Sequence, residues 1–271
     1  MIPLEDSFQD ILGKAQRGLK LSTDTIARDA GVSEADFQKA LDGHFDEKTV
    51  AKVAPVLKLD AGRLVALGKK EWHPGTTQFP EGLARTNTPF DDMTVNAYIV
   101  WDPATKKAAI FDTGADCEPL LAIIREKGLH PEYILLTHTH ADHIADLSKL
   151  TKATGASVHG HKSEVSGRAK PLEWGDKFPL GNLTIEARQT SGHAIGGTTF
   201  FITGLKTPVA VVGDAIFAGS MGGGAISYAD ALRTNRANIF TLPDETVLCP
   251  GHGPLTTVGL EKKHNPFYPE F

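Results

Sequence analysis

The sequence predicts an α/β domain, with helices outside a central pair of sheets, preceded by a small all-α domain. Up to about residue 70, apolar residues recur at helical spacing between polar turns. Beyond residue 72, β-rich runs alternate with helical stretches, and runs such as 133–137 are apolar without alternation, as in strands covered on both faces. Polar clusters follow several of these runs, at positions where α/β folds gather functional residues.

The predicted all-α domain covers residues 1–71. Its helical stretches are expected at residues 4–18, 22–31, 33–43, 46–59 and 60–70. Ser22 or Thr23 is the expected cap of the second stretch, and Gly31 ends it. Ser33 is the expected cap of the third stretch, with Asp36 three residues later as its capping-box partner.

The predicted α/β domain covers residues 72–271. Its β-rich runs lie at residues 95–102, 107–116, 132–140, 156–161, 183–193, 198–204, 208–217 and 238–253. Helical stretches at 118–128 and 145–155 alternate with these runs, as in an α/β domain whose helices lie outside a central pair of sheets.

Composition excludes several classes of protein. No apolar run approaches the roughly 18 residues that span a bilayer, and the first residues contain no apolar signal region, so a cytoplasmic protein without membrane partners is expected. The net charge of −5 argues against a nucleic-acid-binding surface. Cys117 and Cys249 match no zinc-site spacing, and we expect two reduced thiols.

Polar residues with the chemistry of metal ligands follow four of the apolar runs. They are His138, His140, Asp142, His143, His193, Asp214 and His252. His138 and His140 share one face of an extended chain and can therefore bind one ion, while Asp142 and His143 can face a second ion where the chain turns. Imidazole and carboxylate suit zinc, iron or manganese. The other histidines are interpreted as ordinary polar side chains, namely His44, His73, His130, His159, His161 and His264.

Four segments, THTHADH, SGHAIGG, GDAIF and PGHGP, resemble the successive motifs of the metallo-β-lactamase-fold superfamily, over about Trp72 to Phe271. The resemblance implies an αββα sandwich. It also implies that metal 1 is bound by His138, His140 and His193, metal 2 by Asp142, His143 and His252, and both by Asp214. The motifs most resemble those of glyoxalase II-like hydrolases.

That resemblance implies a binuclear hydrolase that cleaves a small-molecule thioester or ester with a metal-bridging hydroxide. Zinc is the expected metal, with iron and manganese as alternatives. Asp142 is the expected catalytic residue, which orients the hydroxide and accepts its proton. Asp112 either fixes a ligand imidazole or caps a turn. Substrate-binding residues are not predicted, although His161 and Tyr228 are considered for the pocket, with a packed core position favoured for Tyr228.

Two other functions are left open. A mononuclear-iron persulfide dioxygenase would use His138, His140 and Asp214. A regulator would sense a ligand in the metal domain and bind DNA, because residues 25–43 resemble the helix-turn-helix of phage repressors of the Cro/C1 type. DNA binding is not expected, since Glu34 and Asp36 occupy the turn nearest the bases. A packing element or a homodimer contact is the preferred role for these helices.

Overall fold

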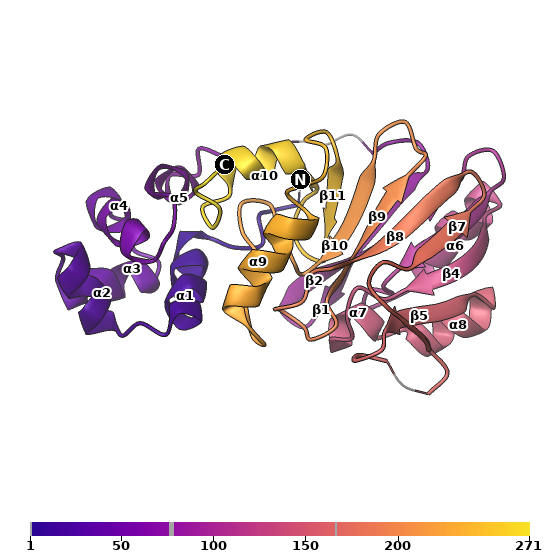
Figure 1. The fold of residues 1–271 in the computed structure, drawn as a ribbon, viewed down its shortest axis with the longest axis horizontal. Coiled ribbons are helices and arrows are strands. Elements are labelled where there is room, and N and C mark those ends of the chain that lie inside the picture. Colours follow the sequence, from indigo (N-terminus) through magenta and orange to yellow (C-terminus); the bar gives the residue numbers. More distant parts are fainter. Residues whose placement is uncertain (1, 76–78, 166) are drawn as a thin grey trace.

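The computed structural model describes residues 2–75, 79–165 and 167–271. Its first part is helical, with α1 (Phe8–Leu19), α2 (Thr23–Ala30), α3 (Glu34–Leu41), α4 (Glu47–Val56) and α5 (Ala61–Gly68). These helices gather at one end of the molecule (Figure 1). Helices are therefore confirmed in each of the predicted helical stretches.

Local sequence sets the helix ends. The Asp36 amide donates to the Ser33 hydroxyl over 3.0 Å, and that hydroxyl donates to the Asp36 carboxylate over 2.7 Å, so the predicted cap of α3 is confirmed. Helix α2 stops at Gly31, which takes the left-handed conformation with φ 63°. Helix α1 runs to Leu19 instead of stopping at residue 18, because Lys20 takes the left-handed conformation that ends it.

The first sheet has the strand order β1-β2-β3-β4-β5-β6. The strands are β1 (Leu83–Phe90), β2 (Met93–Trp101), β3 (Lys107–Phe111), β4 (His130–Leu135), β5 (Ser157–His161) and β6 (Lys170–Leu172). The first two pairings are antiparallel and the rest are parallel. The helices after β3 and β4 are α6 (Glu118–Lys127), α7 (Ala141–Ile144) and α8 (Leu147–Thr154).

The second sheet has the strand order β12-β11-β10-β9-β8-β7. The strands are β7 (Lys177–Leu180), β8 (Leu183–Gln189), β9 (Thr198–Thr203), β10 (Val209–Gly213), β11 (Val247–Pro250) and β12 (Thr256–Thr257). Only the β10–β11 pairing is parallel among the described strands of this sheet. Its helices are α9 (Tyr228–Asn238) and α10 (Val258–His264).

The sheets pack face to face, with Tyr98, Phe111 and Phe200 buried between them. On the outer side of the first sheet, Ile99 and Ile110 belong to a buried cluster with residues of α6 and α8. Helices α9 and α10 cover the second sheet (Figure 1). The layers are therefore helix, sheet, sheet and helix, which confirms the predicted αββα sandwich. No helix in the described ranges is long and apolar enough to cross a membrane.

The N-terminal helices share a core with the second sheet. One buried cluster contains Ile11 and Leu12 of α1 together with Leu248 of β11 and Tyr268 near the C-terminus. Full burial of two such aliphatic side chains contributes about 3–6 kcal/mol, a large part of a typical domain's stability. Gly18 lies so close to the Tyr228 ring that a Cβ there would be 2.2 Å from its Cγ. The predicted boundary at residue 71 falls between α5 and β1 and stays a prediction.

A buried carboxylate joins α10 to the loop after β10. Glu261 is fully buried and accepts hydrogen bonds from the Gly219 amide at 3.0 Å, the Asn265 amide group at 2.9 Å and the Thr256 hydroxyl at 2.7 Å. Burial outweighs these bonds and raises the pKa of Glu261 to about 7 from 4.5. No ion pair to Glu261 is found within the described ranges.

The raised pKa of Glu261 predicts a stability that depends on pH. Between about pH 4.5 and about pH 7 the folded chain retains a proton that the unfolded chain has lost, so the stability this group provides is lost as pH rises through that window. Glu261→Gln, which stays neutral, should gain stability over the parent protein by up to about 3 kcal/mol between pH 5 and pH 8. Denaturant unfolding of both proteins across this range tests it. A difference that does not change with pH would show that Glu261 is ionised throughout.

Candidate metal centre

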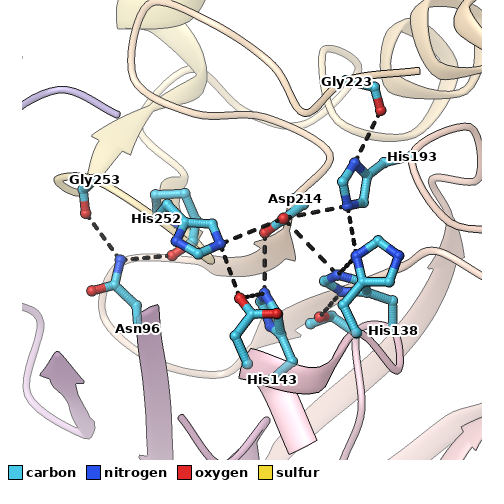
Figure 2. A network of polar contacts seen from close by, with 12 residues as sticks. Asn96, His138, His143, His193, Asp214, Gly223, His252 and Gly253 are labelled. Carbon is cyan, nitrogen blue, oxygen red and sulfur yellow. Dashed lines mark hydrogen bonds and ion pairs between the residues drawn. The ribbon is translucent and has the colours of Figure 1, made fainter. Parts of the chain in front are cut away.

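The predicted ligands come together in two adjoining clusters, on segments that follow strands. Figure 2 labels five of them, His138, His143, His193, Asp214 and His252. His138 and His140 lie on the short extended segment after β4, and His140 directly precedes α7, which carries Asp142 and His143. His193 follows β8, Asp214 follows β10 and His252 follows β11. Strands β10 and β11 are parallel, so their carboxyl ends bring Asp214 and His252 to the same edge.

The first cluster consists of His138, His140, His193 and Asp214. The Nδ1 atom of His140 lies 3.1 Å from His138 Nε2 and 3.0 Å from His193 Nε2. The Oδ2 atom of Asp214 lies 3.4 Å from His193 Nε2 and 3.9 Å from His138 Nε2. Ligand atoms bound 2.0–2.1 Å from a tetrahedral ion are ~3.3 Å apart. The spacing of these donor atoms therefore fits a single ion.

The second cluster consists of Asp142, His143 and His252. Asp142 Oδ2 lies 3.2 Å from His252 Nε2 and 3.4 Å from His143 Nε2. Asp214 reaches this cluster too, because its Oδ1 lies 3.3 Å from His143 Nε2 and its Oδ2 lies 3.6 Å from His252 Nε2. The Asp214 carboxylate thus lies within 4 Å of imidazoles from both clusters.

Two features of the centre suit cations. His143 Nε2 and Asp214 Oδ1 are buried and lack a hydrogen-bond partner, although an orphaned buried polar atom is costly. Gly251 leaves room beside them, because a Cβ there would lie 2.2 Å from Asp214 Oδ1. A divalent ion would satisfy both atoms, so the residues present fit the metals that the motifs imply.

Burial controls the charge of the first cluster. It lowers the pKa of His138 well below the ordinary value, and the neighbouring His143 lowers it further. Burial likewise lowers the pKa of His193. Both imidazoles are therefore neutral at physiological pH, which is the form that binds metals.

Carboxylates control the charge of the second cluster. Burial lowers the pKa of His143, but Asp214 and Asp112 outweigh it and raise that pKa to about 10. Burial also lowers the pKa of His252, but hydrogen bonds to Asp142 and Asp214 outweigh it and raise that pKa to about 11. Burial raises the pKa of Asp214, yet His143 and the other imidazoles hold it well below its usual range. The carboxylates thus make this pocket favourable for positive charge.

Asp112 contacts the imidazole of one predicted ligand, His143. Its Oδ2 accepts a hydrogen bond from His143 Nδ1 over 2.8 Å, which turns His143 Nε2 toward Asp214. Its two oxygens also accept from the amide and hydroxyl of Thr137, over 2.8 Å and 2.7 Å. Asp112 holds the left-handed conformation with φ 59°, which is uncommon for residues other than glycine and is found at functional sites.

Sequence reasoning missed the backbone groups that orient two other ligands. His193 Nδ1 lies 2.9 Å from the Gly223 carbonyl oxygen, and His252 Nδ1 lies 2.8 Å from that of Thr94. It also missed Asn96, whose amide group donates to the carbonyls of Pro250 and Gly253, both over 2.9 Å (Figure 2). Every residue has a backbone carbonyl, so no sequence signal marks the first two.

Other residues considered from the sequence lie outside the two clusters. The His161 ring stacks on Trp174 with a centroid distance of 4.0 Å, and its Nδ1 contacts the Ser163 hydroxyl at 2.7 Å. Tyr228 packs against Phe267 and the shared core, which confirms the core interpretation. The two cysteines are free and buried.

Known proteins are similar to this chain in sequence and fold. The model of the metallo-beta-lactamase superfamily matches residues 90–252. The chain belongs to the metallo-beta-lactamase superfamily. The superfamily match begins after α5, so the likeness of the N-terminal helices to a helix-turn-helix stays a prediction.

Three individual proteins are similar to this chain over most of their own length. The probable metallo-hydrolase YqgX of Bacillus subtilis is 29% identical over 205 residues, covering 66% of this chain and 94% of that protein. The hydroxyacylglutathione hydrolase GloC of Haemophilus influenzae is 29% identical over 197 residues, covering 64% and 92%. The crystal structure of ETHE1 from Myxococcus xanthus matches with a TM-score of 0.61 and 26% identity, covering 69% and 85%.

Proposed function

We propose that the chain is a binuclear metallohydrolase that cleaves a small-molecule thioester or ester bond. The second cluster carries this proposal, because Asp142, His143 and His252 form a further set of ligands that a one-metal site would not need. Zinc is the expected metal, with iron or manganese as alternatives. The similarity to YqgX and GloC supports hydrolysis.

Two divalent ions bound by these clusters supply water of lowered pKa and polarise a carbonyl oxygen. The substrate approaches on the side of His140, which is exposed, whereas His138 and Asp214 are buried. The loops around the ligands hold the reacting groups in place, so little reorganisation is needed during the reaction.

Asp142 is the proposed general base. Burial raises the pKa of Asp142, but the hydrogen bond from His252 outweighs burial and lowers it, so this carboxylate is ionised at neutral pH. It accepts the proton that water loses as the water oxygen bonds to the carbonyl carbon. The bond from carbon to sulfur or oxygen then breaks, and the electron pair leaves with the thiolate or alkoxide.

Metal analysis and a thioester assay test the proposal together. Protein expressed with zinc and iron available should contain about two metal ions per chain. It should release thiol from S-acyl glutathione thioesters without consuming oxygen. His252→Ala should lose most of this activity, whereas His159→Ala, outside both clusters, should retain it. Thiol release that is the same in both variants would contradict the proposal.

The similarity to ETHE1 favours a second candidate, a mononuclear-iron persulfide dioxygenase. It would use His138, His140 and Asp214 as ligands. Glutathione persulfide in an oxygen electrode separates the candidates. Rapid oxygen uptake by protein holding a single iron ion would replace the hydrolase proposal with this one.

For the N-terminal helices we propose a role other than DNA binding. Helix α3 would be the recognition helix, and its first turn exposes Glu34 and Asp36. These carboxylates would be repelled by the phosphates that line the major groove. The contact between Lys14 of α1 and the Met221 carbonyl, in the loop after Asp214, supports a structural role instead.

A further inference from the structure

We propose that Asp6 and Lys14 are positioning residues of the metal centre, which act through the glycine-rich loop after Asp214. This inference rests on the proposed binuclear function, because it concerns how the metals are held. The superfamily match starts at residue 90 and therefore says nothing about the N-terminal helices. The inference assigns to them the positioning of metal ligands.

The glycine-rich loop, residues 219–224, presses against two ligands. The Gly223 carbonyl oxygen fixes the His193 ring through a contact of 2.9 Å to Nδ1 (Figure 2). A Cβ on Gly222 would lie 1.9 Å from the Asp214 carbonyl oxygen and 3.1 Å from His193 Nδ1. A small displacement of this loop would therefore turn His193 and move Asp214.

The N-terminal segment holds the other side of this loop. The Lys14 ammonium group forms an ion pair with Asp6 and donates to the Met221 carbonyl over 2.9 Å. The Ser220 hydroxyl donates to the same Asp6 carboxylate over 2.6 Å. The side chains of Lys14 and Asp6 are only 15% and 8% exposed, so solvent screens the pair weakly.

This connection is stiff because α1 is anchored in the shared core. Ile11 and Leu12 precede Lys14 on the helix and are fully buried. The same segment touches the loop of a third ligand, since a Cβ on Gly253, next to His252, would lie 3.2 Å from the Glu5 amide nitrogen. The start of the chain thus contacts loops that carry ligands of both clusters.

Lys14→Met removes the ammonium group but leaves an apolar side chain of similar length. It removes the cation that Asp6 pairs with and the donor to the Met221 carbonyl, and leaves Asp6 with the Ser220 hydroxyl, so the loop is held less firmly. We expect zinc to bind about tenfold more weakly at one of the two sites, the lower end of what loss of an outer partner of a ligand costs. Asp6→Asn should do the same. The double variant should lose less than the sum, because the two residues act as one unit.

A pair on the same helical module provides the matched control. Asp36 and Lys39 also form an ion pair, but their side chains are 51% and 65% exposed and lie far from the loop in the chain. Asp36→Asn and Lys39→Met should leave zinc affinity unchanged. Competition with a chromogenic chelator measures both binding steps for the full-length protein, and thermal unfolding without metal reports stability separately.

The imidazole N–H signal of His193 in NMR spectra of the metal-free protein gives a readout that general destabilisation would not move. It should shift or exchange faster in Lys14→Met and stay unchanged in Lys39→Met. If Lys14→Met does not fold, Ser220→Ala tests the same connection with the ion pair intact. Variants that unfold more easily yet bind both zinc ions as the parent does would overturn the inference. A parent protein that binds two ions of none of the three metals, zinc, iron or manganese, would instead refute the binuclear function.

Discussion

Replacing Asp214 with alanine should remove metal from both clusters and abolish hydrolysis. The Asp214 carboxylate contacts His193 at 3.4 Å in the first cluster and His143 at 3.3 Å in the second. Without it, the first cluster retains only imidazoles, the second retains Asp142 as its one carboxylate, and no negative charge is shared between them. Loss of an outer partner of a ligand costs about 10–100-fold in metal affinity, so loss of a shared direct ligand should exceed a hundredfold.

Metal content after gel filtration and thiol release together measure this effect. Asp29→Ala is the control, since Asp29 is an exposed carboxylate on α2, away from the metal loops. The control should retain metal and activity. Double occupancy in Asp214→Ala would show that the carboxylate does not bridge, and occupancy of one site would assign it to the other cluster.

Replacing Asp142 with asparagine should lower kcat by about 10²–10⁴-fold, the usual contribution of a general base. Asparagine keeps the shape of the side chain and an oxygen near His252 but cannot accept the proton. KM should change little, because the carboxylate is proposed to act on the attacking water and not on the substrate. The first cluster should retain its metal, since Asp142 does not belong to it.

Asp146→Asn is the matched control for this variant. Asp146 lies on the same stretch of chain, but its carboxylate accepts from the Cys117 amide over 3.0 Å and is not in either cluster. Steady-state rates and metal content of both variants separate loss of the base from loss of the ion. An Asp142→Asn protein with full kcat and two metals would remove Asp142 from the mechanism.

The residues of the candidate site could be predicted from the sequence in more detail than the packing of the helices could, for a physical reason. Zinc, iron and manganese are bound by imidazole and carboxylate groups, and α/β folds gather functional residues after their strands, so His193 and His252 stand out in the sequence even though no local pattern links them. Asp112 could be predicted only in part, because a residue that ends an apolar run can either reach a ligand or cap a turn. The carbonyls of Thr94 and Gly223 were not, since any residue supplies the same atom.

The packing of the N-terminal helices was not predictable from periodicity. The helical spacing of Phe8, Ile11, Leu12 and Ala15 shows that one face of α1 is apolar. It does not show which surface of the protein covers that face. The covering residues include Phe267 and Tyr268, which follow more than two hundred residues later in the sequence. From the sequence alone, Lys14 would be interpreted as an ordinary surface lysine, because its partner Met221 is distant in the chain.

The shared core also sets the order in which the protein can be completed during synthesis. Arg63 at the start of α5 donates to the carbonyls of Asn265 and Tyr268, over 3.1 Å and 2.9 Å, from the other end of the chain. Contacts of such long sequence separation form late and slow folding. The N-terminal helices are synthesised first, but their apolar face is covered only after the last residues of the chain have been synthesised. During that interval the apolar face of these helices is exposed to water, and a chain that stops before α10 lacks the residues near the C-terminus that cover it.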